Sequence, residues 1–332
     1  MDKFGFIVHP RSLEDIYAYN KLLRFLPPPI IKEVLKHVPA YKLSDISTVR
    51  SATGQEITGC IIGCNLLPQQ ILQLNPDFVL KKIINAAKIA ERLGAKIVGL
   101  GAYTAIVPDK GYSVAKNLDI AVTTGSTYTA WLALEGISEC IQERNLSWEQ
   151  LNVAIIGATG SIGSLCTKWL CPRVSKIIMS ARHIEKLERL KNLVREIHPR
   201  AVVIEQDAHK AIKEADIVIT TTSAPEALLD INEFKPGAIV CDIAVPANVQ
   251  VRFKERKDVK LFKGGLAKLP SEVNFGISLG LPKGLVYGCI AETMLLTFEG
   301  RFENYSLGDD IDPAKLEEIA AIGRRHGFGV GW

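Results

Sequence analysis

The chain has 332 residues, of which 47% are apolar and 23% are charged, as in an ordinary globular protein. Its net charge of +4 comes from 40 basic and 36 acidic residues scattered along the chain without aromatic interleaving, which argues against a nucleic-acid-binding protein. The N-terminus shows no secretory signal and no uninterrupted apolar stretch has bilayer length, so we expect a cytoplasmic protein with reduced thiols and no transmembrane segment.

A chain of this length is longer than one typical hydrophobic core supports, which predicts two α/β domains. We expect an α/β substrate domain over residues 1–140 and a Rossmann-type, doubly wound NADP-binding domain over residues 141–275. Residues 276–332 would form a C-terminal segment that packs at the interdomain cleft.

In the first domain, "KFGFIVHP" predicts a short strand, and a helical run starts at Leu13 before the Pro-punctuated stretch 26–31. Apolar spacing predicts a helix from about Asp77 to Leu93, ended by Gly94. "AKIVGLGAYTAIV" reads as a buried strand that runs into a loop, and "TYTAWLALEGISECIQERN" as a long helix.

From Asn152 onward, strands and helices alternate in the rhythm of a doubly wound nucleotide-binding sheet. "VAIIGATGSIGSLCTKWLC" predicts a strand, a glycine turn and a helix. "KIIMSAR", "AVVIEQD", "IVITTTS" and "GAIVCDIAVP" predict further strands, and a last helix is expected from about Pro313 to Arg325.

The turn "GATGSIG" carries the cofactor signal, because glycine spacing after a strand and before a helix is what a dinucleotide site requires. Gly157 would permit the tight turn, Gly160 would let the backbone approach the pyrophosphate, and Gly163 would let the helix lie close to the strand. The residues assigned to this contact are Gly157, Ala158, Thr159, Gly160, Ser161, Ile162 and Gly163.

The following strand ends in "MSAR", which offers Ser180 and Arg182 where an NAD site would place a carboxylate. An arginine there would pair with a 2′-phosphate, so we predict NADPH as the cofactor. After the fourth strand, Thr221, Ser223 and Ala224 are candidate contacts on the nicotinamide side. For Asp242, a structural and a catalytic role remain equally open.

Histidines and cysteines are the remaining candidates for chemistry. His9 and His326 could line a cleft, although a lone histidine is usually structural. The cysteines lack the spacing of a metal site, so no metal is expected. Cys289 alone follows a glycine-rich loop and begins a helix, where free N–H groups are expected to lower the thiol pKa; a small buried residue is the alternative.

Several motifs, spread over nearly the whole chain, resemble those of the long-chain acyl-[acyl-carrier-protein] reductase family. They are "HPRSLED", "SATGQEITG", "LGAYTAI", "TTGSTYTAW", "VAIIGATGSIGS", "CIAETMLLTFEG" and "RHGF". The resemblance implies that Cys289 is the acylated nucleophile and that NADPH is the reductant. Tyr128 stands where that family usually has histidine.

The implied reaction is reduction of a long-chain acyl thioester to a fatty aldehyde. The acyl donor would be acyl carrier protein or a coenzyme A thioester, with a downstream aldehyde-using enzyme as a further partner. Donors for the oxyanion would come from Thr124, Ser126 and Thr127, or from loop N–H groups around Gly288.

Two other functions fit the same two-domain plan. A shikimate-type or amino-acid-type dehydrogenase would use a lysine or aspartate acid–base pair and no cysteine. A sensor that binds NADP without turnover would consume no NADPH.

Overall fold

The computed structural model describes residues 1–197, 201–223, 228–250 and 256–332. The chain divides into two compact units, each assembled from segments distant in the sequence. The first unit comprises Met1–Gly125, Lys268–Gly308 and Ala321–Gly329, and the second comprises Ser126–Ala267, Asp309–Ala320 and Val330–Trp332. The α/β class predicted from the alternating pattern is confirmed.

The first unit is built on a five-stranded sheet in the order β2-β3-β1-β4-β5. Its strands are β1 (Asp2–Val8), β2 (Tyr41–Arg50), β3 (Glu56–Gly63), β4 (Ile97–Leu100) and β5 (Ala121–Thr123). All neighbouring strands run parallel except β2, which pairs antiparallel with β3. The sequence reading did not predict β2, because its alternation of polar and apolar residues is irregular.

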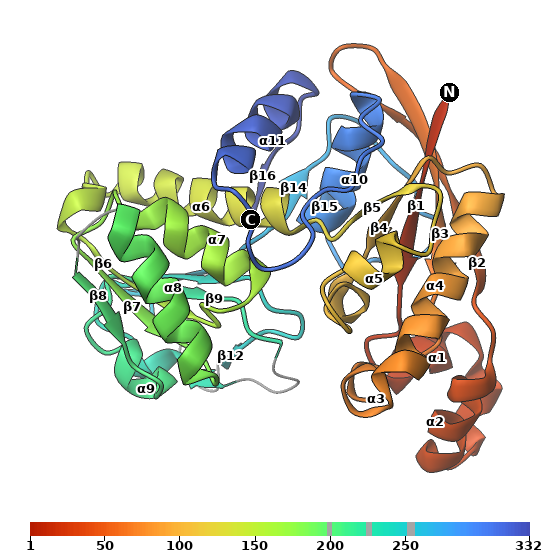
Figure 1. The fold of residues 1–332 in the computed structure, drawn as a ribbon, viewed down its shortest axis with the longest axis horizontal. Coiled ribbons are helices and arrows are strands. Elements are labelled where there is room, and N and C mark those ends of the chain that lie inside the picture. The colour runs from red at the N-terminus through yellow and green to blue at the C-terminus, as the bar shows by residue number, and fades with distance from the viewer. Residues whose placement is uncertain (198–200, 224–227, 251–255) are drawn as a thin grey trace. The chain divides into compact units, whose positions relative to one another are not determined.

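Two helices, α4 (Pro76–Arg92) and α10 (Gly288–Phe298), cover the sheet of the first unit on opposite faces (Figure 1). Glycines in neighbouring strands of the sheet allow both helices to lie close to it. A methyl group on Gly5 would lie 2.4 Å from Ala90 Cβ of α4, and one on Gly99 would lie 2.2 Å from Thr293 Oγ1 of α10. Consequently α10, from late in the chain, completes the core of the N-terminal sheet.

The remaining elements of the first unit are short. Helices and turns comprise α1 (Leu13–Tyr19), η1 (Lys21–Phe25), α2 (Pro28–His37), α3 (Pro68–Gln73), η2 (Ala102–Ala105) and α5 (Tyr112–Ala115), with the strand β15 (Leu285–Tyr287). The Pro-punctuated stretch thus opens α2, since proline is well tolerated in the first turn of a helix.

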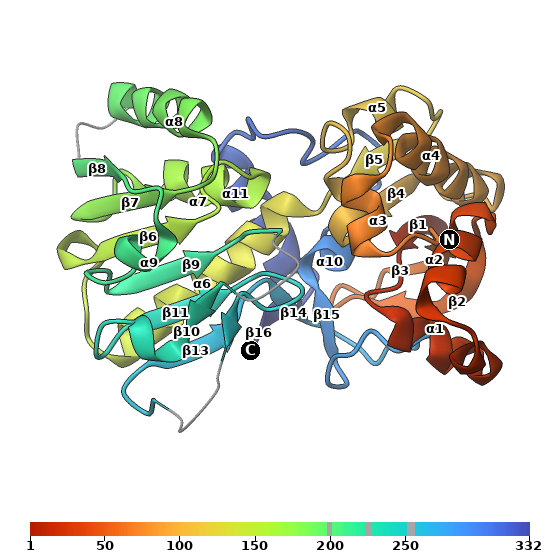
Figure 2. The ribbon, with the colours of Figure 1, turned by 90° about the horizontal axis from the view of Figure 1, so that it is seen from below.

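A parallel six-stranded sheet forms the second unit, in the order β13-β11-β9-β6-β7-β8. The strands are β6 (Asn152–Ile156), β7 (Lys176–Ser180), β8 (Ala201–Ile204), β9 (Ile217–Thr220), β11 (Ile239–Asp242) and β13 (Lys260–Lys263). Read from β6, this is the Rossmann order, in which the chain reverses direction across the sheet between β6 and β9. Figure 2 shows β8, β7, β6 and β9 following one another.

The helices of this unit are α6 (Ser126–Glu143), α7 (Ser161–Leu170), α8 (Ile184–Ile197) and α9 (Ala208–Ala211). Shorter elements are η3 (Trp148–Gln150), β10 (Leu229–Asp230), η4 (Ile231–Glu233) and β12 (Val249–Gln250). Three elements cross the boundary between the units: β14 (Leu266–Lys268), α11 (Ala314–Arg325) and β16 (Gly329–Gly331). Among the described residues, no helix combines the length and apolarity needed to span a membrane.

Candidate active site

Cys289 is the second residue of α10, which begins at Gly288 after its N-cap residue Tyr287. Of the seven cysteines in the chain, Cys289 is the one residue that is only partly buried, and the other six are buried. Cys140, Cys166, Cys171 and Cys241 therefore have the packing role expected for them.

The loop after β5 lies directly against Cys289. A methyl group on Gly125 would lie 2.1 Å from Cys289 Cα and 2.3 Å from its Cβ, and Gly125 has a φ of +74°. Both features require glycine at this position. The Gly125 N–H donates to Thr123 Oγ1 at 3.2 Å, and the Thr123 hydroxyl donates to a carboxylate oxygen of Glu292. This chain of hydrogen bonds joins the loop to α10.

Burial raises the pKa of the Cys289 thiol to about 12, and the carboxylate of Glu292 acts in the same direction. Backbone N–H groups of Ile290, Cys289 and Ala102 oppose this shift, but they do not outweigh burial. The helix N-terminus thus acts on the thiol in the expected direction, but the expected low pKa is wrong because burial outweighs it. The thiol is protonated at neutral pH, so a nucleophilic role requires an acceptor for its proton.

Glu292 is fully buried one helical turn after Cys289. The sequence reading quoted this residue within a motif but gave it no role. Its signal was a carboxylate inside an apolar helix, since a charged residue is rarely buried without a function or a partner. Its position three residues after the thiol makes it a candidate acceptor for the thiol proton.

Arg11, its partner Asp15 and Tyr287 form a second polar cluster, which is not predicted from the sequence. Arg11 pairs with Asp15 through Nε at 3.0 Å and Nη2 at 2.8 Å, and this pairing raises the pKa of Arg11 and lowers that of Asp15. Burial raises the pKa of the Tyr287 phenol, and the charge of Arg11 acts against it. A cation and a phenol are thus held beside the start of α10.

His9 has a structural role. Its Nδ1 lies 3.0 Å from the Pro10 carbonyl oxygen and its Nε2 accepts the Tyr103 N–H at 3.3 Å. Burial lowers the pKa of His9, so the ring is neutral with its proton on Nδ1. Because both nitrogens are engaged, His9 is not placed to exchange protons with substrate.

The hydroxyl candidates after β5 differ in position. The Thr124 hydroxyl donates its proton to the Ser306 carbonyl within the first unit. Ser126 and Thr127 are buried in the first turn of α6, which belongs to the second unit, so their contribution to an oxyanion site stays a prediction. Tyr128 is fully buried and stacks on Trp131 with ring centroids 5.3 Å apart.

In the second unit, two glycines shape the turn between β6 and α7. Gly157 adopts a φ of +89°, and a methyl group on Gly163 would lie 2.3 Å from the Gly157 carbonyl oxygen. The conformational role of Gly157 and the close approach at Gly163 are therefore confirmed. The turn directs the first N–H groups of α7, which have no helical acceptor, to the end of the sheet.

Two strand ends flank this turn. The Ser180 carbonyl accepts the Gly157 and Ala158 N–H groups at 2.8 and 3.1 Å, and Arg182 is exposed just beyond β7. Thr221, after β9, donates its hydroxyl to backbone carbonyls of the turn, 3.1 Å from that of Gly157. Thr221 stands at the end of β9, beside β6, where the sheet order reverses, whereas Ser180 and Arg182 stand at the end of β7 on the other side of β6.

All of the sequence-predicted cofactor contacts remain predictions. Ser223 is half-buried after β9, and Ala224 lies outside the described residues.

Asp242 anchors the loop after β11. Its carboxylate accepts the Thr220 hydroxyl at 2.6 Å and the N–H groups of Ala244, Asn248 and Val249 at 3.1, 2.7 and 3.0 Å. Because its carboxylate accepts four hydrogen bonds from neighbouring groups, Asp242 has a structural role, which is one of the two roles considered for it. Among the described residues, no cluster of three or more His, Cys, Asp or Glu side chains could hold a metal ion.

The sheet order and the glycine turn define the second unit as a Rossmann-type domain, the class of domain that binds nicotinamide nucleotides in many oxidoreductases. The family model of shikimate / quinate 5-dehydrogenase matches residues 139–263, which belong to that domain.

The whole chain is similar to a long-chain acyl-[acyl-carrier-protein] reductase of Synechococcus elongatus, with 29% identity over 98% of both chains. The resemblance predicted from the motifs is confirmed by this match. The chain is also 26% identical to the aminotransferase PigE of a Serratia species, over 98% of this chain and 39% of that relative. A glutamyl-tRNA reductase of Thermosipho melanesiensis is 28% identical over 37% of this chain and 33% of its own.

Proposed function

We propose that this protein reduces a long-chain acyl thioester to a fatty aldehyde with NADPH, through an acyl-enzyme on Cys289. The observation that carries the proposal is the position of Cys289, a partly buried cysteine in the first turn of α10 against a glycine loop. It is supported by full-length similarity to a long-chain acyl-[acyl-carrier-protein] reductase. Six buried cysteines elsewhere offer no alternative nucleophile.

In this proposal the glycine turn of the second unit would hold the cofactor. The first N–H groups of α7 would bind its pyrophosphate, and Arg182 would pair with the 2′-phosphate that distinguishes NADPH. Thr221 would hold the turn in shape through its bonds to the backbone carbonyls of residues 156 and 157. When bound, the reduced nicotinamide supplies a hydride.

The chain's own groups would perform the acyl transfer. Cys289 Sγ forms a bond to the thioester carbonyl carbon as its proton moves to the Glu292 carboxylate, and the carrier sulfur leaves and takes that proton. One thioester replaces another, so little bond energy changes. After two-electron reduction and protonation of the carbonyl oxygen, the hemithioacetal on Cys289 breaks its C–S bond, releasing aldehyde and the thiol.

Backbone N–H groups are the donors best placed for the oxyanion. Those of Cys289, Ile290 and Ala102 surround the sulfur closely enough to act on its pKa. The hydroxyl proton of Thr124 is already donated to Ser306, so Thr124 would position the loop, and Ser126 remains a proposed donor from α6.

The proposed acyl donor is acyl carrier protein, with a coenzyme A thioester as the alternative. A net charge of +4 suits an acidic carrier, because opposite charges accelerate association. We further propose that the reaction takes place in the cytoplasm and that a downstream enzyme consumes the aldehyde.

A second candidate function follows from the family match to shikimate / quinate 5-dehydrogenase over residues 139–263. A dehydrogenase of that kind would move hydride to or from a carbon that bears oxygen or nitrogen, with no need for Cys289. Alkylation of Cys289 would leave its activity intact.

Intact mass spectrometry after incubation with a fatty acyl thioester, with and without NADPH, tests the proposal. We expect an acyl adduct on the wild-type protein that disappears when NADPH is added, with aldehyde formed in equal amount. Cys289→Ala should form neither adduct nor aldehyde and should bind NADPH normally, whereas Cys140→Ala serves as the matched control. Full aldehyde formation by Cys289→Ala would overturn the assignment.

A further inference from the structure

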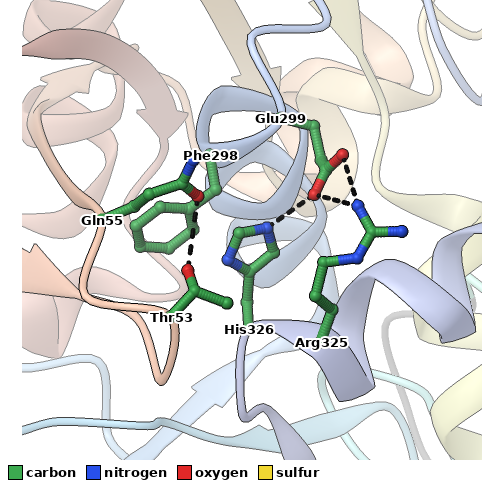
Figure 3. A pocket seen from close by; sticks show the side chains of 6 residues that line it. All are labelled: Thr53, Gln55, Phe298, Glu299, Arg325 and His326. Atoms are coloured by element: carbon green, nitrogen blue, oxygen red, sulfur yellow. Dashed lines mark hydrogen bonds and ion pairs between the residues drawn. The ribbon is translucent and has the colours of Figure 1, made fainter.

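At the opposite end of α10 from Cys289, the first unit contains a cavity of about 300 Å³ that the proposed reaction does not use. Three segments line it: the turn between β2 and β3, the C-terminal end of α10 and the C-terminal end of α11. The lining residues are Thr53, Gln55, Phe298, Glu299, Arg325 and His326 (Figure 3).

His326 is fixed in one orientation at the floor of this cavity. Its ring stacks on Phe298 with centroids 4.8 Å apart and an interplanar angle of 16°. Its Nε2 lies 2.8 Å from Glu299 Oε1, and the His326 carbonyl accepts the Ala52 N–H at 3.0 Å. These contacts fix the ring and its backbone before a ligand binds. Binding therefore costs little conformational entropy at His326, which favours affinity.

The bond to Glu299 also sets the tautomer of His326. Arg325 donates to both oxygens of Glu299 at 2.8 and 2.9 Å. Burial works to raise the pKa of Glu299, but hydrogen bonds from His326 and Arg325 and the charge of Arg325 lower it overall, so the carboxylate is ionised at neutral pH. A carboxylate accepts a hydrogen bond from a protonated nitrogen, so Nε2 carries a hydrogen, and in the neutral ring Nδ1 then presents a lone pair.

Nδ1 of His326 lacks a hydrogen-bond partner among the described residues. The side chain is nevertheless only 1% exposed. Buried polar atoms in proteins nearly always have a partner. Figure 3 shows this nitrogen turned toward the side of the cavity where Thr53 lies. The missing partner must therefore carry an O–H or N–H group.

The charges of the cavity limit what that partner can be. Glu299 and Arg325 neutralise each other through their paired hydrogen bonds, which leaves no uncompensated charge among the described lining residues. Gln55, at the exposed rim, offers an amide that can donate to a carbonyl oxygen, while its Oε1 lies 3.5 Å from the Thr53 hydroxyl oxygen. A ligand with one donor and one acceptor would satisfy both ends of the site.

We propose that this cavity is a binding site for a neutral amide or hydroxy-amide group, whose N–H or O–H donates to Nδ1 of His326 and whose carbonyl accepts from Gln55. Ions are poorer ligands because each would bury a charge without a counter-charge. The site stands apart from the acyl chemistry, since it uses neither Cys289 nor the glycine turn.

Three probes of the same shape but different charge test the proposal on the full chain: acetamide, acetate and acetamidinium. The readout is the two-bond ¹H–¹⁵N correlation spectrum of the imidazoles, with His326 assigned by loss of its signals in His326→Gln. In the free protein we expect the Nε2–H tautomer. Acetamide should shift the Nδ1 resonance of His326 saturably, and the two ions should not.

Substitutions at two exposed glutamines test whether Gln55 contacts the ligand. Gln55→Leu should weaken acetamide binding about tenfold, by loss of one hydrogen bond. Gln69→Leu, the same change on the exposed surface of α3, should leave it unaltered. A proton on Nδ1 in the free protein, a larger response to either ion, or no saturable shift with acetamide would each overturn the proposal, the last because water alone would then fill the cavity.

Discussion

Gly125 and Cys289 are in direct backbone contact: the position that a methyl group on Gly125 would take is 2.1 Å from Cys289 Cα. The loop after β5 and the first turn of α10 come from segments more than 160 residues apart, joined also through Thr123 and Glu292. The position of Cys289 therefore depends on Gly125, a residue without a side-chain functional group.

Gly125→Ala should destabilise the first unit by about 1–3 kcal/mol and abolish acylation of Cys289, because the new methyl group displaces the start of α10. Urea unfolding and acyl-adduct formation measure the two effects. Gly94→Ala is the matched control: Gly94 has a φ of +84° but open space around its Cα, so it carries the same backbone cost without the clash. Equal behaviour of the two variants would contradict a steric role for Gly125.

The charge of Glu292 should be visible in the reactivity of Cys289. Glu292 raises the pKa of the thiol, so Glu292→Gln should lower that pKa and speed alkylation by iodoacetamide at pH 9 by about tenfold. The same variant should slow aldehyde formation, since the proposed proton acceptor is gone. Glu303→Gln, an exposed change in the same unit, is the control. Slower or unchanged alkylation would show that Glu292 carries no charge beside the sulfur.

Cofactor choice should depend on Arg182. Arg182→Ala is expected to weaken NADPH binding by about tenfold or more and to leave NADH binding unchanged, because only NADPH carries the 2′-phosphate. Fluorescence titration of the two nucleotides measures this difference. Arg189→Ala removes an equally exposed charge from α8 and should have little effect. If the wild-type protein binds both nucleotides equally, the assignment of Arg182 fails.

Stability should fall in alkali. Burial raises the pKa of Cys64, Cys166 and Cys289 from 9.0 to about 12. Between these values the folded protein keeps protons that the unfolded chain has lost, so the free energy of unfolding decreases as pH rises, by about 1.4 kcal/mol per pH unit for each thiol. Below pH 9 this contribution is fully present.

Urea unfolding from pH 8 to 11 measures that slope. Cys166→Ala should be less stable at every pH, because it leaves a cavity, but its stability should decline less steeply than that of the wild type. Parallel curves for the two proteins would mean that Cys166 does not titrate abnormally.

The sequence alone determined the elements whose signals are local. Glycine spacing after an apolar strand located the turn at Gly157, and apolar periodicity located α4. The β-strand and helix alternation after Asn152 predicted the Rossmann unit because its central strands are buried on both faces and so read as continuous apolar runs. Cys289 stood out since a thiol at a helix start differs from thiols within helices and strands.

Only the tertiary structure decided the environment of these residues. The high pKa of Cys289 depends on burial and on Glu292, the structural role of Asp242 on four donors, and the tautomer of His326 on Glu299. Desolvation and hydrogen bonding arise from atoms that folding gathers from distant segments, as when α10 closes over the N-terminal sheet. The sequence shows which chemical groups are present, whereas the folded structure determines which of them stay exposed to solvent.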